Sequence, residues 1–242
     1  FEFDNANNFS LYISGKEDEG KEIDFANIGF EASKNNYAKH YQKFTNNFKV
    51  ESNDENINKL NTLIPWYTHN ALVHFTSPHG LEQYGGAAWG TRDVCQGPLE
   101  LLGSFGHLDQ AKELIIKLYS NQLSNGNWGQ WFMFDRYKGI MQEHSHGDVV
   151  VWPLKAIAYY IEKSGDHEIL NLVIKDDTKE TLLDLIKKQI DYIKNNFVSG
   201  TSLICYNDGD WDDTLQPVND DMRKNMVSGW TVALLFESVT KL

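Results

Sequence analysis

The sequence has little cysteine, little proline and no long apolar run. Two of its 242 residues are cysteines and five are prolines. Disulfide-held secreted domains carry dense, even-numbered sets of cysteines, so Cys95 and Cys205 favour reduced thiols and a cytoplasmic location, with one disulfide left open as the alternative. No apolar stretch approaches the ~18 residues of a membrane helix, and no basic region precedes an apolar one near Phe1. Neither a membrane span nor a signal peptide is expected.

Runs of basic residues are also missing. The chain has 22 Lys and Arg against 34 Asp and Glu, for a formal net charge of −12. A surface that binds nucleic acid needs clustered positive charge along the phosphates, so this class of partner is excluded. Neutral, hydroxyl-rich partners fit the charge better. The 41% of hydrophobic residues is enough for one sizeable core in a globular protein.

Residues 1–54 are rich in Asn, Lys and Glu, and only Phe9, Leu11 and Ile13 alternate as in a strand. This part is expected to be an extended or loosely structured N-terminal approach segment, which leaves one folded domain at residues 55–242. The first residue is not Met and the last helical pattern stops with the chain. Both features suggest that the sequence is part of a longer protein.

Beyond residue 54, apolar residues recur at helical spacing in about six segments. Gly106 and Gly165 mark tight corners, whereas residues 84–90 and 121–146 form long loops rich in Gly, Trp and His. This alternation predicts a mainly α fold, an (α/α)6 toroid of which only part is present. The expected helices are 55–75 with a break or kink at Pro65, 93–105, 108–119, 149–163 with Pro153 in its first turn, 179–197 and 222–242.

The most informative loop is 208–213, which has four aspartates around Trp211. Gly209 and Pro217 separate it from helices on either side. An aromatic face with nearby carboxylates suits a sugar site, since the ring packs on the indole and the acids serve hydroxyls and proton transfer. Asx turns are the structural alternative. A calcium loop is less favoured, because its twelfth position would be Asn219 or Asp221 rather than Glu.

Two further motifs contain polar side chains at loop positions. In residues 90–98, Arg92 and Asp93 suit hydroxyl binding or, alternatively, a local ion pair at a helix start. In residues 142–154, His144 and His146 could chelate a metal, but no further ligands with zinc spacing accompany them. Hydrogen bonds to a sugar or to Asp148, or a purely structural loop, remain open.

The aromatic residues of the long loop have two possible roles. Trp128, Trp131 and Phe134 could stack on sugar rings, but a place in the core is favoured, because aromatic clusters in long loops usually pack on themselves.

The order and spacing of these three motifs resemble glycoside hydrolase family 94, the inverting β-glucoside phosphorylases. The resemblance covers roughly residues 55–242, and the sequence of residues 208–217 is most similar to that of the family's 1,2-β-oligoglucan phosphorylases. It implies an (α/α)6 barrel and inverting phosphorolysis of β-linked glucooligosaccharides, β-1,2-glucans among them, to α-glucose 1-phosphate. The enzyme would be a hexosyltransferase.

The resemblance also implies roles for individual residues. The family's general acid corresponds to Asp213, while Asp212 stands where the disaccharide phosphorylases have Asn, and which of the two holds the proton stays open. Arg92 belongs to an Arg-Asp-x-x-Gln-Asp motif that holds glucosyl hydroxyls, although Gly97 replaces its last Asp. The expected substrate-binding residues are Arg92, Asp93, Gln96, His144, Asp148, Asp210, Trp211 and Asp212.

No metal and no cofactor are expected, and inorganic phosphate is the co-substrate together with an oligosaccharide. In the family, the phosphate-binding residues follow the acid and would lie beyond this chain, so the isolated chain is expected to fold poorly and to be inactive. A homodimer is the family's frequent assembly. Two alternatives remain: an inverting hydrolase with Asp93 or Asp148 as the base, and an inactive carbohydrate-binding fragment.

Overall fold

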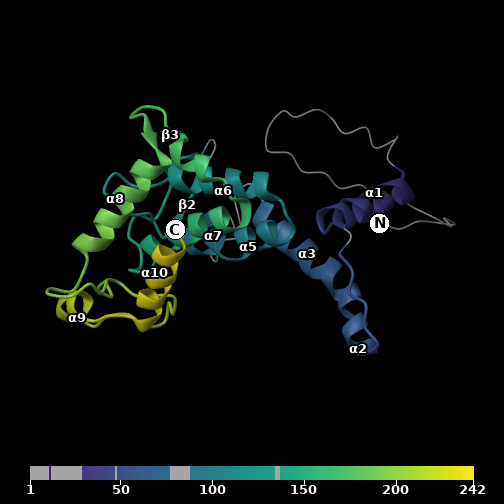
Figure 1. Ribbon diagram of the computed structural model, residues 1–242. Coiled ribbons are helices and arrows are strands. Elements are labelled where there is room, and N and C mark those ends of the chain that lie inside the picture. The colour runs from purple at the N-terminus through teal and green to yellow at the C-terminus, as the bar shows by residue number, and fades with distance from the viewer. Residues whose placement is uncertain (1–10, 12–28, 47, 77–87, 134–136) are drawn as a thin grey trace. The chain divides into compact units, whose positions relative to one another are not determined.

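The computed structural model describes Leu11 and residues 29–46, 48–76, 88–133 and 137–242, and these are mainly helical (Figure 1). The chain divides into two compact units, Phe1–Asn58 and Lys59–Leu242. The boundary between them follows residue 58, whereas it was expected after residue 54. Phe9 and Ile13 of the expected strand lie outside the described residues. In the described part of the chain, no helix is both long and apolar enough to cross a bilayer.

The first unit contains a helix where loose structure was expected. Helix α1 spans Phe30–Phe44, and none of its residues is buried. The Thr45 hydroxyl donates to the carbonyl of Tyr41 and closes the last turn. Helix α2 (Glu55–Asn58) follows after a turn in which the Asn56 N–H donates to Asp54 Oδ1 over 2.8 Å. The expectation for residues 30–44 was therefore wrong, because local helix formation does not require a buried face.

The second unit begins with helix α3, Leu60–Thr76, which contains Pro65. The interruption in the predicted helix lies at Lys59, between α2 and α3, rather than at Pro65. A proline close to a helix start removes only one intrahelical hydrogen bond, so the remaining turns still form.

The core of the second unit is built around helix α7, Trp152–Ser164, which packs against α6 (Leu108–Ser120) and α10 (Gly229–Lys241). Figure 1 shows α7 between these elements. The helix predicted at 108–119 is confirmed. The helix predicted at 149–163 is confirmed from Trp152 on, with Pro153 in its first turn, whereas residues 149–151 form a 3-10 helix before it. In the predicted apolar face of α6, Leu108 is half-buried and the other five residues are buried: Ala111, Leu114, Ile115, Leu118 and Tyr119.

Buried polar groups connect α6, α7 and α8 (Leu182–Asn195). The Tyr119 hydroxyl of α6 lies 2.9 Å from Gln189 Oε1 of α8 and 3.2 Å from the carbonyl oxygen of Pro153 in α7. Gln189 Nε2 donates to the carbonyl of Val150 over 2.6 Å. The Trp128 indole N–H donates to the carbonyl of Leu118, and its ring meets that of Tyr119 edge-on at 5.2 Å. Because buried polar groups are costly when unpaired, these bonds fix how the three helices meet.

Three predicted helices have different ends. Helix α8 starts at Leu182 rather than Lys179, because Thr181 and Asp184 form a capping box and Lys179 has a φ of 57°. The helix predicted at 93–105 is split into α4 (Thr91–Cys95) and α5 (Gly97–Ser104).

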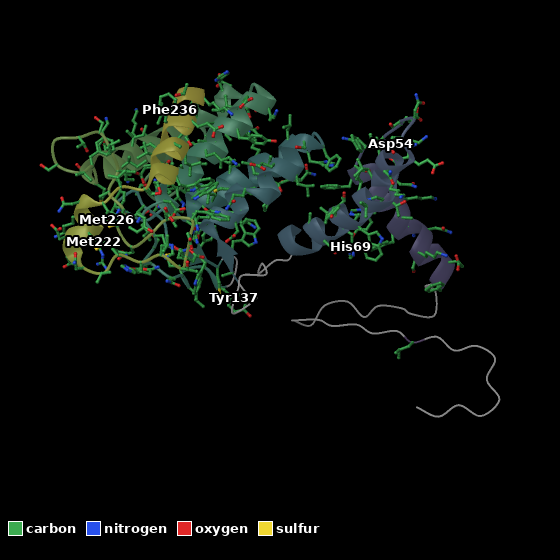
Figure 2. The ribbon with its side chains drawn as sticks, turned by 90° about the horizontal axis from the view of Figure 1, so that it is seen from below. Asp54, His69, Tyr137, Met222, Met226 and Phe236 are labelled. Atoms are coloured by element: carbon green, nitrogen blue, oxygen red, sulfur yellow. The ribbon has the colours of Figure 1, made fainter. Side chains whose placement is uncertain are left out.

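The last predicted helix, 222–242, is split into α9 (Asp220–Asn225) and α10. The backbone of Met226 is extended, and the Ser228 side chain accepts from the Thr231 N–H as a new N-cap. Figure 2 shows Met222 and Met226 at α9 and Phe236 on α10, where 70% of Phe236 is exposed.

Short strands organise the long aromatic loop. Strand β1 (Trp89–Gly90) pairs antiparallel with β2 (Trp131–Phe132), and Phe132 forms a further bridge to Met141. Trp128 and Phe132 are buried, and Trp131 is half-buried. The core interpretation is thus confirmed for Trp128, whereas Phe134 lies outside the described residues, as do residues 84–87. The remaining short elements are η3 (Val149–Val151), η4 (His167–Asn171), β3 (Val173–Lys175) and β4 (Glu180–Thr181).

Candidate active site

Arg92 is positioned by the start of helix α4. The preceding residue, Thr91, donates its N–H to the carbonyl of Gln130 over 3.0 Å and its hydroxyl to the carbonyl of Gly129 over 2.7 Å. These bonds attach α4 to the aromatic loop just after β1. The Arg92 side chain is therefore directed into the unit, and only 8% of the residue is exposed.

The Arg92 guanidinium joins all three sequence motifs. Its Nη2 lies 2.6 Å from Asp213 Oδ1, and its Nη1 donates to the carbonyl of Asp210 over 2.9 Å. The same Nη1 lies 3.6 Å from Asp148 Oδ2. Arg92 thus pairs with two carboxylates distant in sequence. The alternative of a local ion pair with Asp93 does not describe this arrangement.

Asp148 is completely buried behind Arg92. Its Oδ2 accepts from the Trp152 indole N–H over 2.9 Å, while its Oδ1 has no hydrogen-bond partner among the described residues. Burial raises the pKa of the Asp148 carboxyl, although the Arg92 charge and the Trp152 hydrogen bond lower it. With no exposed surface, Asp148 can orient Arg92 but does not face a ligand arriving from solvent.

The acidic loop is held by its own side chains. Asp210 Oδ1 accepts from the Asp212 N–H, and Asp212 Oδ1 accepts from both the N–H and the hydroxyl of Thr214. These contacts are Asx turns, which were the structural alternative to a sugar site for this loop. Asx turns fix the backbone of the loop and leave its carboxylates available for a functional role. The Thr214 hydrogen bonds lower the pKa of Asp212, which keeps that carboxylate ionised. Asp210 Oδ2 accepts from the Ser228 hydroxyl and ties the loop to α10.

His146, rather than His144, contacts Asp213. Its Nδ1 lies 3.1 Å from both Asp213 Oδ1 and the carbonyl of Asp210. Because the Gln216 amide nitrogen donates to Nε2 at 3.2 Å, the ring hydrogen lies on Nδ1 and points at these two oxygens. The expected substrate-binding residues included His144 but not His146, so the contact between His146 and Asp213 was not predicted from the sequence.

His144 belongs to a neighbouring ion-pair cluster. Its Nε2 lies 3.0 Å from Asp208 Oδ2, and Arg223 Nη2 lies 2.8 Å from Asp208 Oδ1. The described residues contain no group of three or more His, Cys, Asp or Glu side chains that could hold a metal ion.

Close backbone approach brings the two loops together. The Gly147 N–H donates to the carbonyl of Gly209 over 2.9 Å. A Cβ at Gly147 would lie 2.5 Å from the carbonyl oxygen of Tyr206, so only glycine fits there. Gly209 has a φ of 137°, a conformation that side chains rarely allow. This contact is what places His146 against Asp213.

Three of the expected site residues lie apart from the Arg92–Asp213 pair. Asp93 is exposed, and Gln96 Nε2 donates to the carbonyl of Arg92 over a long 3.3 Å. Trp211 is 54% exposed, and its ring centroid lies 5.9 Å from that of Trp230. The structure therefore joins Arg92, Asp148, Asp210 and Asp213 into one cluster, adds His146 to it, and leaves an aromatic pair on the surface.

The chain is similar to known proteins of one family. The chain is 49% identical, over 212 residues, to a 1,2-beta-oligoglucan phosphorylase from Listeria innocua. The match covers 84% of this chain and 20% of that relative, so the chain spans about one fifth of the relative's length. Residues 40–241 match the family model described as "Glycosyl hydrolase 94 superfamily, catalytic domain". The family inferred from the three motifs is confirmed: this chain belongs to the glycosyl hydrolase 94 superfamily and contains part of its catalytic domain.

Proposed function

We propose that the whole protein is an inverting glycoside phosphorylase that converts β-1,2-linked glucooligosaccharides and phosphate to α-glucose 1-phosphate. The name of the relative supports the reaction and the linkage. The observation that carries the proposal is the state of the Asp213 carboxyl. Arg92 and His146 both contact Oδ1, while the side chain is 43% exposed. One oxygen is thus held, and the other is available to a substrate.

The proposed reaction uses these two oxygens differently. Asp213 Oδ2 donates its proton to the interglycosidic oxygen as the bond from that oxygen to the anomeric carbon breaks. Phosphate attacks the anomeric carbon from the opposite face, which inverts the configuration and leaves a glucan shorter by one unit. The carboxylate that forms is stabilised by Arg92 and the Nδ1–H of His146. A solvent proton restores the acid.

The other site residues support binding and position. Trp211 offers an exposed indole face on which a sugar ring can stack, and the ionised Asp212 accepts hydrogen bonds from hydroxyl groups. Asp93, Gln96, His144 and Asp210 are proposed as further polar contacts, as in the motifs of the family. Asp148 is assigned a positioning role, because it holds Arg92 and is buried.

We extend the proposal to the whole protein. Residues 55–242 would form part of an (α/α)6 barrel, approached by residues 1–54, although the family match already begins at residue 40. The reaction would need phosphate but no metal or cofactor, in a cytoplasmic homodimer; the two buried free thiols favour that location. The isolated chain would be inactive, and phosphorolysis by the purified 242-residue chain would contradict this.

An inverting hydrolase on the same fold would need a base that activates water. Asp148 is a poor candidate because it is fully buried and contacts Arg92 and Trp152. Asp93 is exposed but does not contact the Arg92–Asp213 pair. A phosphorylase needs no such base, since phosphate is itself the nucleophile.

The test is incubation of the whole protein with 1,2-β-glucooligosaccharides, with and without phosphate. Glucose 1-phosphate that forms only with phosphate supports the phosphorylase. Free glucose released without phosphate would support the hydrolase, and binding without either product would support a carbohydrate-binding role.

A further inference from the structure

A polar cavity of about 230 Å³ lies next to the Arg92–Asp213 pair. It is bounded by the loops around residues 123–127, 143–147 and 207–208 and by Tyr192 of α8. Arg92, Asp148 and Asp213 do not line it. His146 does, so this ring lies between the cavity and the carboxyl of Asp213.

Hydrogen-bonding groups in the cavity are left without partners in a specific pattern. Asn127 Nδ2 donates to Ser145 Oγ over 3.3 Å and to the Tyr192 hydroxyl over 3.2 Å. Both hydroxyls therefore act as acceptors, and their own hydrogens have no acceptor within the described part of the chain. Asn127 Oδ1 is buried and likewise has no partner there. Two donors and one acceptor thus remain for a ligand.

The charges of the lining select the class of ligand. Asp208 and Glu143 are carboxylates, and the Asp208 charge is already matched by His144 and Arg223. A phosphate would meet the Glu143 carboxylate and the carbonyl oxygen of the Asn127 side chain, both of which repel it. A purely apolar ligand would leave the three polar groups buried and unpaired, at a cost for each.

We propose that this cavity binds one neutral sugar ring, a glucosyl unit other than the one cleaved at Asp213. Hydroxyl groups both donate and accept, so a pyranose can satisfy Asn127 Oδ1 and the two hydroxyls together. Leu123 and Val150 add apolar surface for its C–H groups. The volume equals about eight water molecules at ~30 Å³ each, and it is below the ~300–1,000 Å³ of pockets for larger ligands. One ring, rather than a chain, is therefore the expected occupant.

The identity of the ring as glucose rests on the proposed function, so the experiment separates the two. The double variant Ser145→Ala/Tyr192→Phe removes both unpaired donors and keeps the shape of the cavity. In the whole protein, KM for a 1,2-β-glucooligosaccharide should rise roughly fivefold to tenfold with kcat within about twofold, because the lost contacts act on bound substrate throughout. Tyr159→Phe, whose hydroxyl bonds the exposed Glu100 carbonyl, is the matched control and should change neither constant.

A second readout does not depend on turnover. Saturation-transfer NMR with 1,2-β-glucobiose should show contact with the parent protein and a weaker signal for the double variant or, if that variant folds poorly, for Tyr192→Phe alone. Unchanged KM and unchanged NMR contact would overturn the proposal and leave a cavity filled only by water. If the parent forms no glucose 1-phosphate but the NMR difference persists, the phosphorylase assignment fails and the sugar site stands.

Discussion

Arg92 has two carboxylate partners that differ mainly in burial. Asp148 is completely buried at the start of the α7 region, whereas the Asp213 side chain is 43% exposed in the acidic loop. One arginine thus connects a rigid, desolvated carboxylate to a reachable one. Two carboxylates of the same chemistry therefore differ in role: the buried partner orients the guanidinium, and the exposed partner is the one that we propose meets the substrate.

The surroundings of the two carboxylates follow the same division. Asp148 is followed by η3 and α7, whose residues form the centre of the core, and its Oδ2 is bonded to Trp152. The acidic loop instead depends on short Asx turns, on one bond to Ser228 and on the bonds that Arg92 and Gly147 donate to its backbone carbonyls. A substitution should therefore affect mainly stability on the buried side and mainly activity on the exposed side.

The largest expected effect comes from Asp213→Asn. Loss of the general acid should lower kcat by about 10²–10⁴, because the leaving oxygen is no longer protonated. The melting temperature should change little, since the side chain is partly exposed. Phosphorolysis by the whole protein measures the effect. Asp212→Asn is the control, with a loss below about tenfold expected; an equal loss at both positions would contradict the assignment of the acid.

Arg92→Ala tests the buried side. It leaves the Asp148 charge without its partner, so the free energy of unfolding should fall by about 3–5 kcal/mol. Urea titration of the whole protein measures this. Adding Asp148→Asn should recover part of the stability but none of the activity, because the amide no longer needs the guanidinium whereas Asp213 still does. Full additivity of the two stability changes would mean that the two side chains do not interact.

Gly147→Ala tests the contact that joins the two loops. The new Cβ would clash with the Tyr206 carbonyl, and the adjustment should cost about 1–3 kcal/mol while moving His146 away from Asp213. Both the melting temperature and kcat should fall. Gly229→Ala is the matched control, since a Cβ there meets nothing within 4 Å. If Gly147→Ala behaves like Gly229→Ala, the close approach has no role in positioning the site.

The smallest effect concerns the exposed Asp212. Thr214→Val removes the hydroxyl that donates to Asp212, so the pKa of this carboxyl should rise toward its ordinary value. The backbone N–H of residue 214 still donates to Asp212 in this variant. Thr214→Ser keeps the hydroxyl and should leave the pKa low. Carboxyl carbon chemical shifts, followed by NMR as the pH is lowered, distinguish the two. An unchanged pKa in Thr214→Val would show that the backbone N–H alone sets it.

Helices were predicted correctly from the sequence where regularly spaced apolar residues pack against one continuous core. The face of α6 is regular over several turns, and its buried residues follow from spacing alone. The splits at Gln96 and Met226 were missed, because each break is made by local backbone geometry, with a new cap at Ser228 after the second, rather than by a loss of apolar residues. Helix α1 was missed for the opposite reason, since it is a helix without a buried face.

At the site, the three motifs were recognised from the sequence by their order and spacing, and the family that they indicate is confirmed. Which histidine contacts Asp213 was not predictable, because His144 and His146 have the same type and nearly the same position in sequence. The choice depends on the Gly147–Gly209 contact between loops 62 residues apart.

The residue types of the site, the helical periodicity and the family follow from local order along the chain, so they can be predicted without a structure. The burial of Asp148 behind Arg92, the exposure of Asp213 and the contact of His146 with Asp213 are visible only in the folded protein. Burial and pairing depend on which distant segments exclude water from each other, and a linear pattern does not contain that information.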